Sequence, residues 1–288
     1  MTLDARRLRR GGYVLSLALL IAAVGRPVFP RRTAGIEYVV VFDVSLSMAT
    51  EDHVEAGLPR SRLAAAKDRF REVYPDLAPE ARVTIAGAAG GAAQLFLLSR
   101  PARDAEAIEA ALDVLEWDNV WDTGSRIDKV LTDLVTQSHG SRLFSVVGRR
   151  PLLTPPFNIF YFTDGGGDDV GHVLSTYAGT WLRSHTRVAF LGLGQPRPSP
   201  VPEFRRAESR DCLRDDLGRC LTSSLNEENL QALADHLEAR YERLPDAARL
   251  RRLFLDDPLT GAETEVPREV GWLLSLASLG FFLLWVLL

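Results

Sequence analysis

The sequence has 288 residues, which is enough for one ordinary domain with additional terminal segments. Its hydrophobic fraction of 46% and charged fraction of 25% are those of a globular chain and exclude wholesale disorder. A formal net charge of -4, without a basic stripe interleaved with aromatic residues, argues against a nucleic-acid-binding protein.

The N-terminal segment, residues 1–34, joins a basic start to an apolar run. Arginines precede residues 13–24, which carry no charge. This order is typical of a signal sequence. We interpret it as an uncleaved signal anchor, a transmembrane helix, with a cleaved signal as the alternative. Because basic residues favour the cytoplasmic side, it predicts a cytoplasmic basic tail and a translocated domain.

Residues 35–245 alternate between apolar runs and helical patterns, which is typical of an α/β domain. Two of the runs, 82–88 and 94–98, are joined by a Gly-Gly turn and predict an antiparallel hairpin at the edge of the sheet. We expect the other strands to form a mostly parallel sheet with helices on both faces. Strands are predicted at 37–44, 158–163 and 187–193, and helices at 61–73, 104–115, 126–137, 170–183 and 226–241.

The first candidate site residues follow the strand predicted at 37–44. Asp43 stands at its end, and Ser45 and Ser47 follow at every second position, a spacing that turns side chains of a strand toward the same side. Carboxylate and hydroxyl oxygens suit hard cations such as Mg²⁺, Mn²⁺ or Ca²⁺. Ligands of open parallel sheets collect beyond the carboxyl ends of the strands. The alternative is that these are ordinary capping and turn residues.

A second apolar strand, 158–163, also ends in a carboxylate, that of Asp164, which Gly165 follows. Two strand-end carboxylates that converge on one crevice favour a bound cation, because like charges at close range need neutralising. Between the two strands, the polar turn 122–127 opens a predicted helix and offers hydroxyl groups. The sequence therefore predicts a site for a divalent cation.

The two cysteines, Cys212 and Cys220, bracket a segment rich in turn-forming residues. Their spacing does not match that of zinc sites, and no second pair exists. Two alternatives stay open at this point. One is a hairpin closed by a disulfide in an oxidising compartment, and the other is a pair of free thiols.

The C-terminal part is predicted to contain a juxtamembrane linker, 246–269, and a final apolar segment, 270–288. The final segment has 19 residues without a charged side chain, with Trp272 and Trp285 near its ends. As a helix it would nearly cross a hydrocarbon core of about 30 Å. We interpret it as a transmembrane helix, because a buried core helix rarely closes a chain without a polar face.

The order of these motifs resembles that of the metal-ion-dependent adhesion site (MIDAS) of von Willebrand factor type A (VWA) domains. The likeness extends from Glu37 to Tyr241. Residues 48–52 and 62–67 are similar to the membrane-anchored bacterial type, the Bat aerotolerance proteins and the methanol dehydrogenase maturation factors, which accompany MoxR-type AAA+ ATPases. The resemblance implies a Rossmann-like VWA fold between terminal transmembrane helices.

The resemblance also implies the metal ligands, by position. These are Asp43, Ser45, Ser47, Ser125 and Asp164. The family usually has a threonine where this sequence has Ser125, and a serine lacks the methyl group that fixes the rotamer. Thr123 is the alternative ligand. Asp128 stands where the family often has glycine, so the loop geometry is expected to differ slightly. Mg²⁺ is the expected metal, with Mn²⁺ or Ca²⁺ as alternatives.

The expected function is that of a membrane-anchored, metal-dependent protein-binding module, not an enzyme. A partner's Asp or Glu would complete the metal shell, and the Arg- and Pro-rich loop 148–156 would add contacts. The resemblance implies assembly or maturation of an envelope protein or metalloenzyme with a MoxR-type AAA+ ATPase, at the bacterial inner membrane, with the VWA domain in the periplasm.

Two other functions are weighed against it. Asp43 is placed as in haloacid-dehalogenase-like phosphatases, but those enzymes need a second aspartate where Ser45 stands, and no lysine follows at a suitable position. A surface adhesin would use the same metal site, but two membrane anchors and a short linker argue against a projecting adhesin.

Overall fold

The computed structural model describes residues 3–24, 28–55, 57–117, 124, 126–139, 153, 156–166, 176–203, 211–256, 258–269 and 271–287. The chain divides into two compact units. One comprises Met1–Ala34 with Ala262–Leu288, and the other comprises Gly35–Gly261. The candidate site lies in the second, which we call the central unit.

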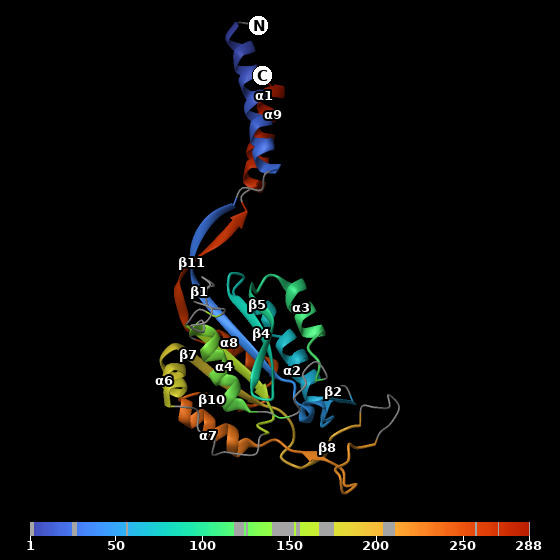
Figure 1. Cartoon of the computed structure of the whole chain (residues 1–288). Coiled ribbons are helices and arrows are strands. Elements are labelled where there is room, and N and C mark those ends of the chain that lie inside the picture. The colour runs from blue at the N-terminus through green and yellow to red at the C-terminus, as the bar shows by residue number, and fades with distance from the viewer. Residues whose placement is uncertain are drawn as a thin grey trace. The chain divides into compact units, whose positions relative to one another are not determined.

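Six strands of a seven-stranded sheet form the centre of the central unit (Figure 1). The strand order is β10-β7-β6-β1-β4-β5, and β11 also pairs with β1. The path from β10 to β4 is parallel, and β5 joins β4 antiparallel at the edge. The predicted mostly parallel sheet with an edge hairpin is therefore confirmed. The strands are β1 (Val28–Asp43), β4 (Arg82–Ala89), β5 (Ala92–Pro101), β6 (Phe157–Thr163), β7 (Thr186–Gly192), β10 (Arg240–Arg243) and β11 (Thr260–Glu269).

Residues 38–42 of β1 are apolar on both faces because both faces of the sheet are covered there. Val40 and Phe42 pack into one hydrophobic core, whereas Val39 and Val41 pack into the other. A strand buried on both sides has no polar face, which explains why this sequence does not alternate. The two cores also hold β1 rigidly, so the residue at its end has a fixed position.

Helices cover both faces of the sheet, as predicted (Figure 1). On one face lie α2 (Arg62–Arg71), α3 (Ala105–Asp113) and α8 (Ala247–Leu255). On the other lie α4 (Ile127–His139), α6 (Thr176–His185) and α7 (Glu227–Leu237). Three of them begin with a side-chain cap. The capping residues are Ser61, Asn226 and Asp246, and each side chain accepts a hydrogen bond from the backbone N–H of the residue three positions later.

The C-terminal part of the central unit differs from the prediction. The helix predicted at 226–241 ends at Leu237, because Glu238 adopts a left-handed conformation with φ 53°, and the chain continues as the edge strand β10. The predicted linker 246–269 was wrong, since it contains α8 and β11. Phe254 of α8 is fully buried and stacks on Phe160 of the sheet with ring centroids 3.6 Å apart. Helix α8 thus belongs to the core.

Two small hairpins extend from the central unit. The first pairs β2 (His53–Glu55) with β3 (Leu58–Arg60), after the short 3-10 helix η1 (Leu46–Ala49). The second, residues 199–223, is called the flap, and residues 204–210 of it lie outside the described residues. Its base pairs β8 (Ser199–Pro200) with β9 (Thr222–Ser223). A further 3-10 helix, η2 (Tyr74–Asp76), follows α2.

The two cysteines lie in the flap and form a disulfide. The Cα atoms of Cys212 and Cys220 are 5.5 Å apart. Isolated bridges pair Arg214 with Cys220 and Pro202 with Cys212. Of the two alternatives for the cysteines, the structure has the disulfide-closed hairpin.

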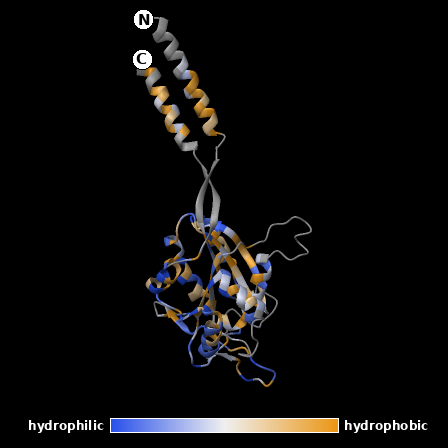
Figure 2. Cartoon of the chain, turned by 90° about the vertical axis from the view of Figure 1, so that its left-hand side faces the viewer, coloured by the Kyte–Doolittle hydropathy of each residue, from blue (hydrophilic) through white to orange (hydrophobic). Residues whose placement is uncertain are grey.

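The terminal unit contains α1 (Leu3–Val24) and α9 (Gly271–Leu287), both rich in hydrophobic residues (Figure 2). Ser16 and Ser278 join them, each hydroxyl donating to the other's backbone carbonyl oxygen, over 3.0 and 2.8 Å. None of the helices in the described part of the chain combines the length and the apolar character that a membrane crossing requires. The predicted transmembrane helices at the two termini are therefore not confirmed.

Candidate metal site

Asp43 is the last residue of β1, and its buried carboxylate accepts hydrogen bonds from Ser45 and Thr163. Its Oδ1 accepts a bond from the backbone N–H of Ser45 over 2.9 Å, and its Oδ2 accepts one from the Thr163 hydroxyl over 2.7 Å. The side chain has no solvent exposure. Both bonds fix the orientation of the carboxylate at the carboxyl edge of the sheet.

The serines lie beside Asp43, but for a reason that differs from the predicted one. The strand ends at Asp43, and residues 46–49 form the 3-10 helix η1. The Ser45 and Ser47 hydroxyl oxygens are 3.1 Å apart. The turn of η1, not the alternation of an extended strand, brings the two hydroxyls together.

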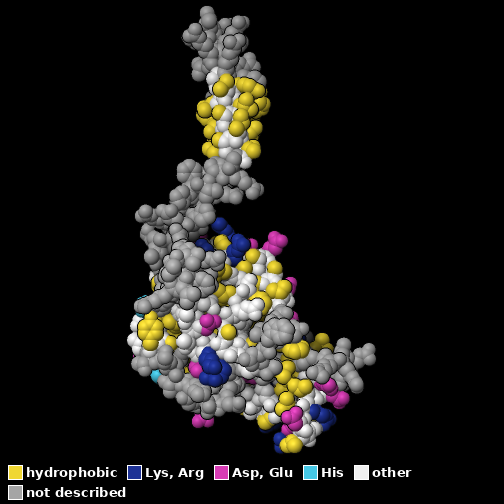
Figure 3. Space-filling model, viewed as in Figure 1, with side chains coloured by type: hydrophobic (Ala, Val, Ile, Leu, Met, Phe, Trp, Pro, Cys, Tyr) yellow, Lys and Arg dark blue, Asp and Glu magenta, His cyan; other side chains and the backbone are white. Residues whose placement is uncertain are grey.

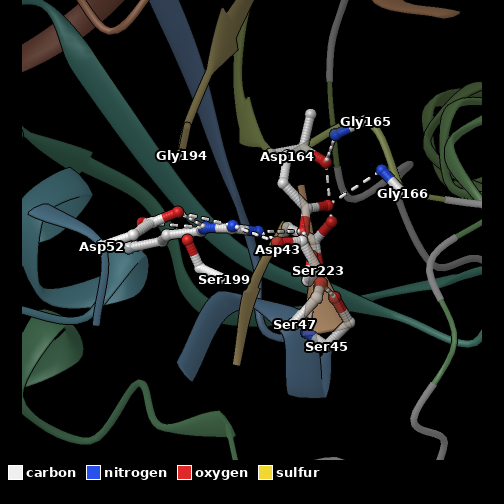
Figure 4. Close-up of polar contacts among 12 residues, drawn as sticks. Asp43, Ser45, Ser47, Asp52, Asp164, Gly165, Gly166, Gly194, Ser199 and Ser223 are labelled. Atoms are coloured by element: carbon white, nitrogen blue, oxygen red, sulfur yellow. Dashed lines mark hydrogen bonds and ion pairs between the residues drawn. The ribbon is translucent and has the colours of Figure 1, made fainter. Parts of the chain in front are cut away.

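Asp164 follows β6, which is the neighbour of β1 in the sheet. Phe42 pairs with Phe162, so the ends of the two strands meet at one edge. Asp164 is fully buried, and its Oδ1 accepts the N–H of Gly166 over 2.8 Å. The structure therefore brings Asp43, Ser45, Ser47 and Asp164 together (Figure 4).

The electrostatics of the pair favour a bound cation. Burial, and next to it the negative charge of Asp164, raise the pKa of Asp43 to about 6. At neutral pH two buried carboxylates thus repel each other, and a divalent cation held by these residues would relieve this repulsion. The donors are carboxylate and hydroxyl oxygens, which fit Mg²⁺, Mn²⁺ or Ca²⁺. Within the described ranges no group of three or more His, Cys, Asp or Glu could hold a metal ion, so the site depends on hydroxyl donors.

The predicted hydroxyl ligand, Ser125 or the alternative Thr123, lies outside the described residues. Gly124 between them is described, and its carbonyl oxygen accepts the N–H of Gly90 over 2.7 Å. Gly90 belongs to the turn of the β4–β5 hairpin. Gly124 is therefore attached to the end of the β4–β5 hairpin.

Arg62 is a further residue of the site, to which the sequence analysis gave no role. Its side chain is fully buried at the start of α2, and its Nη1 donates to Asp164 Oδ2 over 2.8 Å. The same guanidinium donates to both carboxylate oxygens of Asp52 and to the hydroxyl and carbonyl oxygens of Ser223. One arginine thus joins the candidate metal site, the loop after η1 and the flap.

Gly194 leaves the room that Arg62 needs. It follows β7 with φ +105°, and a Cβ atom built on it would lie 2.5 Å from Arg62 Nε. The next residue, Gln195, donates its backbone N–H to Asp52 over 3.0 Å. The loop after β7 therefore closes the arginine pocket.

A weak signal for Arg62 is present in the sequence. A cation in the first turn of a helix is unfavourable beside the positive end of the helix dipole. Here it follows the capping residue Ser61, with Asp52 ten residues earlier. An arginine in that unfavourable place indicates a carboxylate partner, but only the fold shows which one.

No protein-family model matches the chain, and no curated protein matches it in sequence. Solved structures do. An aerotolerance-related membrane protein from Bacteroides fragilis is 23% identical, with a TM-score of 0.57 over 76% of this chain and 96% of that one. BatB from Bacteroides thetaiotaomicron is 21% identical, with a TM-score of 0.58 over 76% and 95%. A von Willebrand factor type A protein from Catenulispora acidiphila is 16% identical, with a TM-score of 0.46 over 77% and 41%.

The chain has the fold of the aerotolerance-related membrane protein and of BatB. At these identities the likeness concerns the fold, and the sites must be argued from the residues. In this fold, Asp43, Ser45, Ser47 and Asp164 lie at the carboxyl ends of β1 and β6. Parallel α/β sheets bind ligands at this edge.

Proposed function

We propose that this chain is a membrane-attached, metal-dependent protein-binding module and not an enzyme. The observation that carries the proposal is the pair of buried carboxylates, Asp43 and Asp164, beside the two hydroxyls at the carboxyl edge of the sheet. Such a set of oxygen donors, with two negative charges in a buried place, suits a divalent cation.

The proposed ligands are Asp43, Ser45, Ser47 and Asp164, with Ser125 or Thr123 as a further hydroxyl. Mg²⁺ is the proposed ion, with Mn²⁺ or Ca²⁺ as alternatives. When bound, the ion supplies an attachment point for a carboxylate of a partner protein. The chain's own residues orient the donors, since Ser45 N–H and Thr163 Oγ1 fix Asp43 while Gly166 N–H and Arg62 fix Asp164.

The hairpins near the site offer apolar contacts to such a partner. Val54 and Leu58 of the first hairpin are 76% and 67% exposed, and Leu217 and Leu221 of the flap are 75% and 38% exposed. Figure 3 shows hydrophobic side chains gathered over the region of β2 and β8. Exposed aliphatic residues on one face are typical of a protein-binding surface. The loop 148–156, to which the sequence analysis gave this role, lies outside the described residues.

The place of action that we propose is the periplasmic side of a bacterial inner membrane. A disulfide persists in an oxidising compartment, and the flap contains one. The apolar helices α1 and α9 are the proposed membrane attachment. A role in the maturation of an envelope protein or metalloenzyme, with a MoxR-type AAA+ ATPase, rests on the family resemblance and is part of this proposal.

Calorimetry of the purified full chain in detergent tests the metal site. We expect one Mg²⁺ or Mn²⁺ to bind wild-type protein, and Asp43→Ala to abolish binding while the circular dichroism spectrum is kept. Asp113→Ala is the matched control, because the Asp113 side chain is exposed. Absence of metal binding to the folded wild type would refute the proposal.

Partner recovery provides the second test. Crosslinking in membranes followed by purification should recover a partner in Mg²⁺ but not in EDTA, and not with Asp43→Ala. Equal recovery with and without the chelator would contradict a metal-dependent contact. Co-purification of an AAA+ ATPase would support the narrower maturation role.

A phosphatase assay tests the enzymatic alternative. Haloacid-dehalogenase-like phosphatases need a second aspartate two residues after the attacking one, and Ser45 stands at that position here. We therefore expect no Mg²⁺-dependent hydrolysis of p-nitrophenyl phosphate. Measurable turnover that Asp43→Asn removes would replace the binding proposal with a phosphatase.

A further inference from the structure

Arg62 and Ser223 form a direct connection between the candidate metal site and the flap. We propose that this connection couples the two, so that a divalent cation at the site holds the flap in one position as part of the partner-binding surface. The inference rests on the proposed metal binding. It adds a positioning residue and a responding element to that function.

The buried guanidinium of Arg62 connects Asp164 with the base of the flap. Arg62 Nη1 bonds Asp164 Oδ2 and Ser223 Oγ, each over 2.8 Å, and Nη2 bonds the Ser223 carbonyl oxygen over 3.1 Å. Nε and Nη2 also bond Asp52. A planar guanidinium holds several acceptors in fixed relative positions, and an ammonium group cannot do so. Arg62 therefore fixes the base of the flap relative to Asp164.

A direct bond also joins the flap to Asp164. The Ser223 hydroxyl donates to Asp164 Oδ2 over 3.1 Å while it accepts from Arg62. The oxygen Oδ2 is thus shared by the arginine and the flap, while Oδ1 accepts the Gly166 N–H. Because both oxygens are engaged, a bound cation that holds the Asp164 carboxylate in this orientation also holds the acceptor to which Arg62 and Ser223 donate.

Backbone hydrogen bonds and the disulfide connect the parts of the flap with one another. Val201 N–H donates to Leu221 O, Leu221 N–H to Leu213 O, and Leu213 N–H to Val201 O, over 2.7 to 2.9 Å. The Cys212–Cys220 disulfide closes the same segment. These hydrogen bonds and the disulfide join the described parts of the flap to one another. A change at Ser223 therefore reaches the exposed Leu217 and Leu221.

The coupling must work in both directions. If a cation at the site stabilises the held position of the flap by some factor, then that position of the flap strengthens cation binding by the same factor. Loosening the flap at Ser223 should therefore weaken cation binding. Ser223 is not among the proposed ligands, but its hydroxyl donates to one of them, Asp164, so weaker Mn²⁺ binding alone would also fit a purely local effect, and the response of the flap decides between the two. We expect Ser223→Ala to weaken Mn²⁺ binding by roughly 5-fold or more, which is the lower range of measured site-to-site couplings.

The experiment combines calorimetry with hydrogen–deuterium exchange on the full chain in detergent, with and without Mn²⁺. In wild type, we expect Mn²⁺ to slow amide exchange in residues 211–223. In Ser223→Ala, Mn²⁺ should bind more weakly and slow the flap less. Ser224→Ala is the matched control, one residue away and without a hydrogen bond to Arg62 or Asp164 among the described residues. It should behave as wild type.

The variant Arg62→Lys tests whether the coupling needs the planar guanidinium or only the positive charge. Lysine keeps the positive charge beside Asp164 but cannot bridge Asp52, Asp164 and Ser223 together. We expect this variant to fold and bind Mn²⁺ while the flap no longer responds. An unchanged flap response in Arg62→Lys, or in Ser223→Ala, would overturn the coupling.

The outcomes also separate this inference from the proposed function. If wild type binds Mn²⁺ but exchange in the flap is the same with and without it, the coupling is wrong and the metal site stands. If calorimetry detects no Mn²⁺ binding to wild type, the proposed function fails and the coupling fails with it.

Discussion

Asp43 is a buried carboxylate beside a second one, and the effect of pH on stability follows from this. Its folded-state pKa is about 6, against an ordinary value of 3.8. A raised folded-state pKa means that ionisation costs stability as the pH rises through this range, and the cost is complete above the folded pKa. In the metal-free protein Asp43 therefore destabilises the fold at neutral pH, and the cost is absent below the unfolded pKa.

Asp43→Asn removes that cost. In EDTA at pH 8 we expect the variant to exceed wild type in the free energy of unfolding by up to about 3 kcal/mol. The difference should shrink as the pH falls from 6 toward 4, where wild-type Asp43 binds its proton. Urea unfolding at pH 8 and pH 4.5 measures it. A difference that is equal at both pH values would contradict the raised pKa, and added Mg²⁺ should stabilise only wild type.

Gly194 provides a prediction about the arginine pocket. Alanine at this position meets two costs, its positive φ and a Cβ atom 2.5 Å from Arg62 Nε. We expect Gly194→Ala to lower the free energy of unfolding by about 2–4 kcal/mol. Gly218→Ala is the control, since Gly218 also has positive φ but its added Cβ meets nothing within 4 Å. It should cost about 1 kcal/mol. If urea unfolding gave the two variants equal losses in the free energy of unfolding, the Arg62 side chain would be able to move away from the added Cβ atom at little cost.

At the scale of the elements, the strands that position the site were predictable and the terminal elements of the domain were not. Residues 38–42 of β1 and 159–162 of β6 are apolar on both faces, so these runs can be predicted as strands from the sequence alone. Tyr241, by contrast, fits the apolar spacing of helix α7, yet it lies in β10. Helix α8 escaped prediction because only Leu250 and Phe254 are fully buried in it, among three arginines.

The site shows the same division. Asp43 and Asp164 could be predicted because each ends an apolar strand, and parallel strands end at one edge. Arg62 could not be assigned, since its partners Asp164 and Ser223 come 102 and 161 residues later in the chain. In a sequence, a buried arginine cannot be told from a surface arginine, because its carboxylate partners are brought to it only by the fold.

The disulfide stabilises one element and not the core, and this gives a prediction. Closing the short loop between Cys212 and Cys220 is worth roughly 2–3 kcal/mol. Because the flap lies outside the two hydrophobic cores, we expect Cys220→Ser to speed amide exchange in residues 211–223 and to leave exchange in β1 and β6 unchanged. Thiol titration of unreduced wild type should detect no free cysteine. A uniform rise in exchange across the sheet would show instead that the flap supports the whole domain.

At the scale of the whole molecule, the central unit contains both hydrophobic cores, and its C-terminal boundary is set by α8. Phe254 is fully buried and contacts the rings of Tyr38, Phe70 and Phe160. The Tyr38 hydroxyl also donates to the Phe254 carbonyl oxygen over 2.9 Å. A domain that ended at residue 245 would expose this cluster, whereas one that ends at 261 keeps it.

Two fragments test this boundary. We expect residues 35–261 to fold alone, to unfold cooperatively and to be stabilised by Mg²⁺, because every proposed ligand and both cores lie within them. Residues 35–245 should lose about 3–5 kcal/mol or more, the cost of removing one large aromatic from a core, and should aggregate or unfold at lower temperature. Differential scanning calorimetry with and without Mg²⁺ measures both. Equal stability of the two fragments would show that α8 is peripheral, and a 35–261 fragment that folds without responding to Mg²⁺ would count against the metal site.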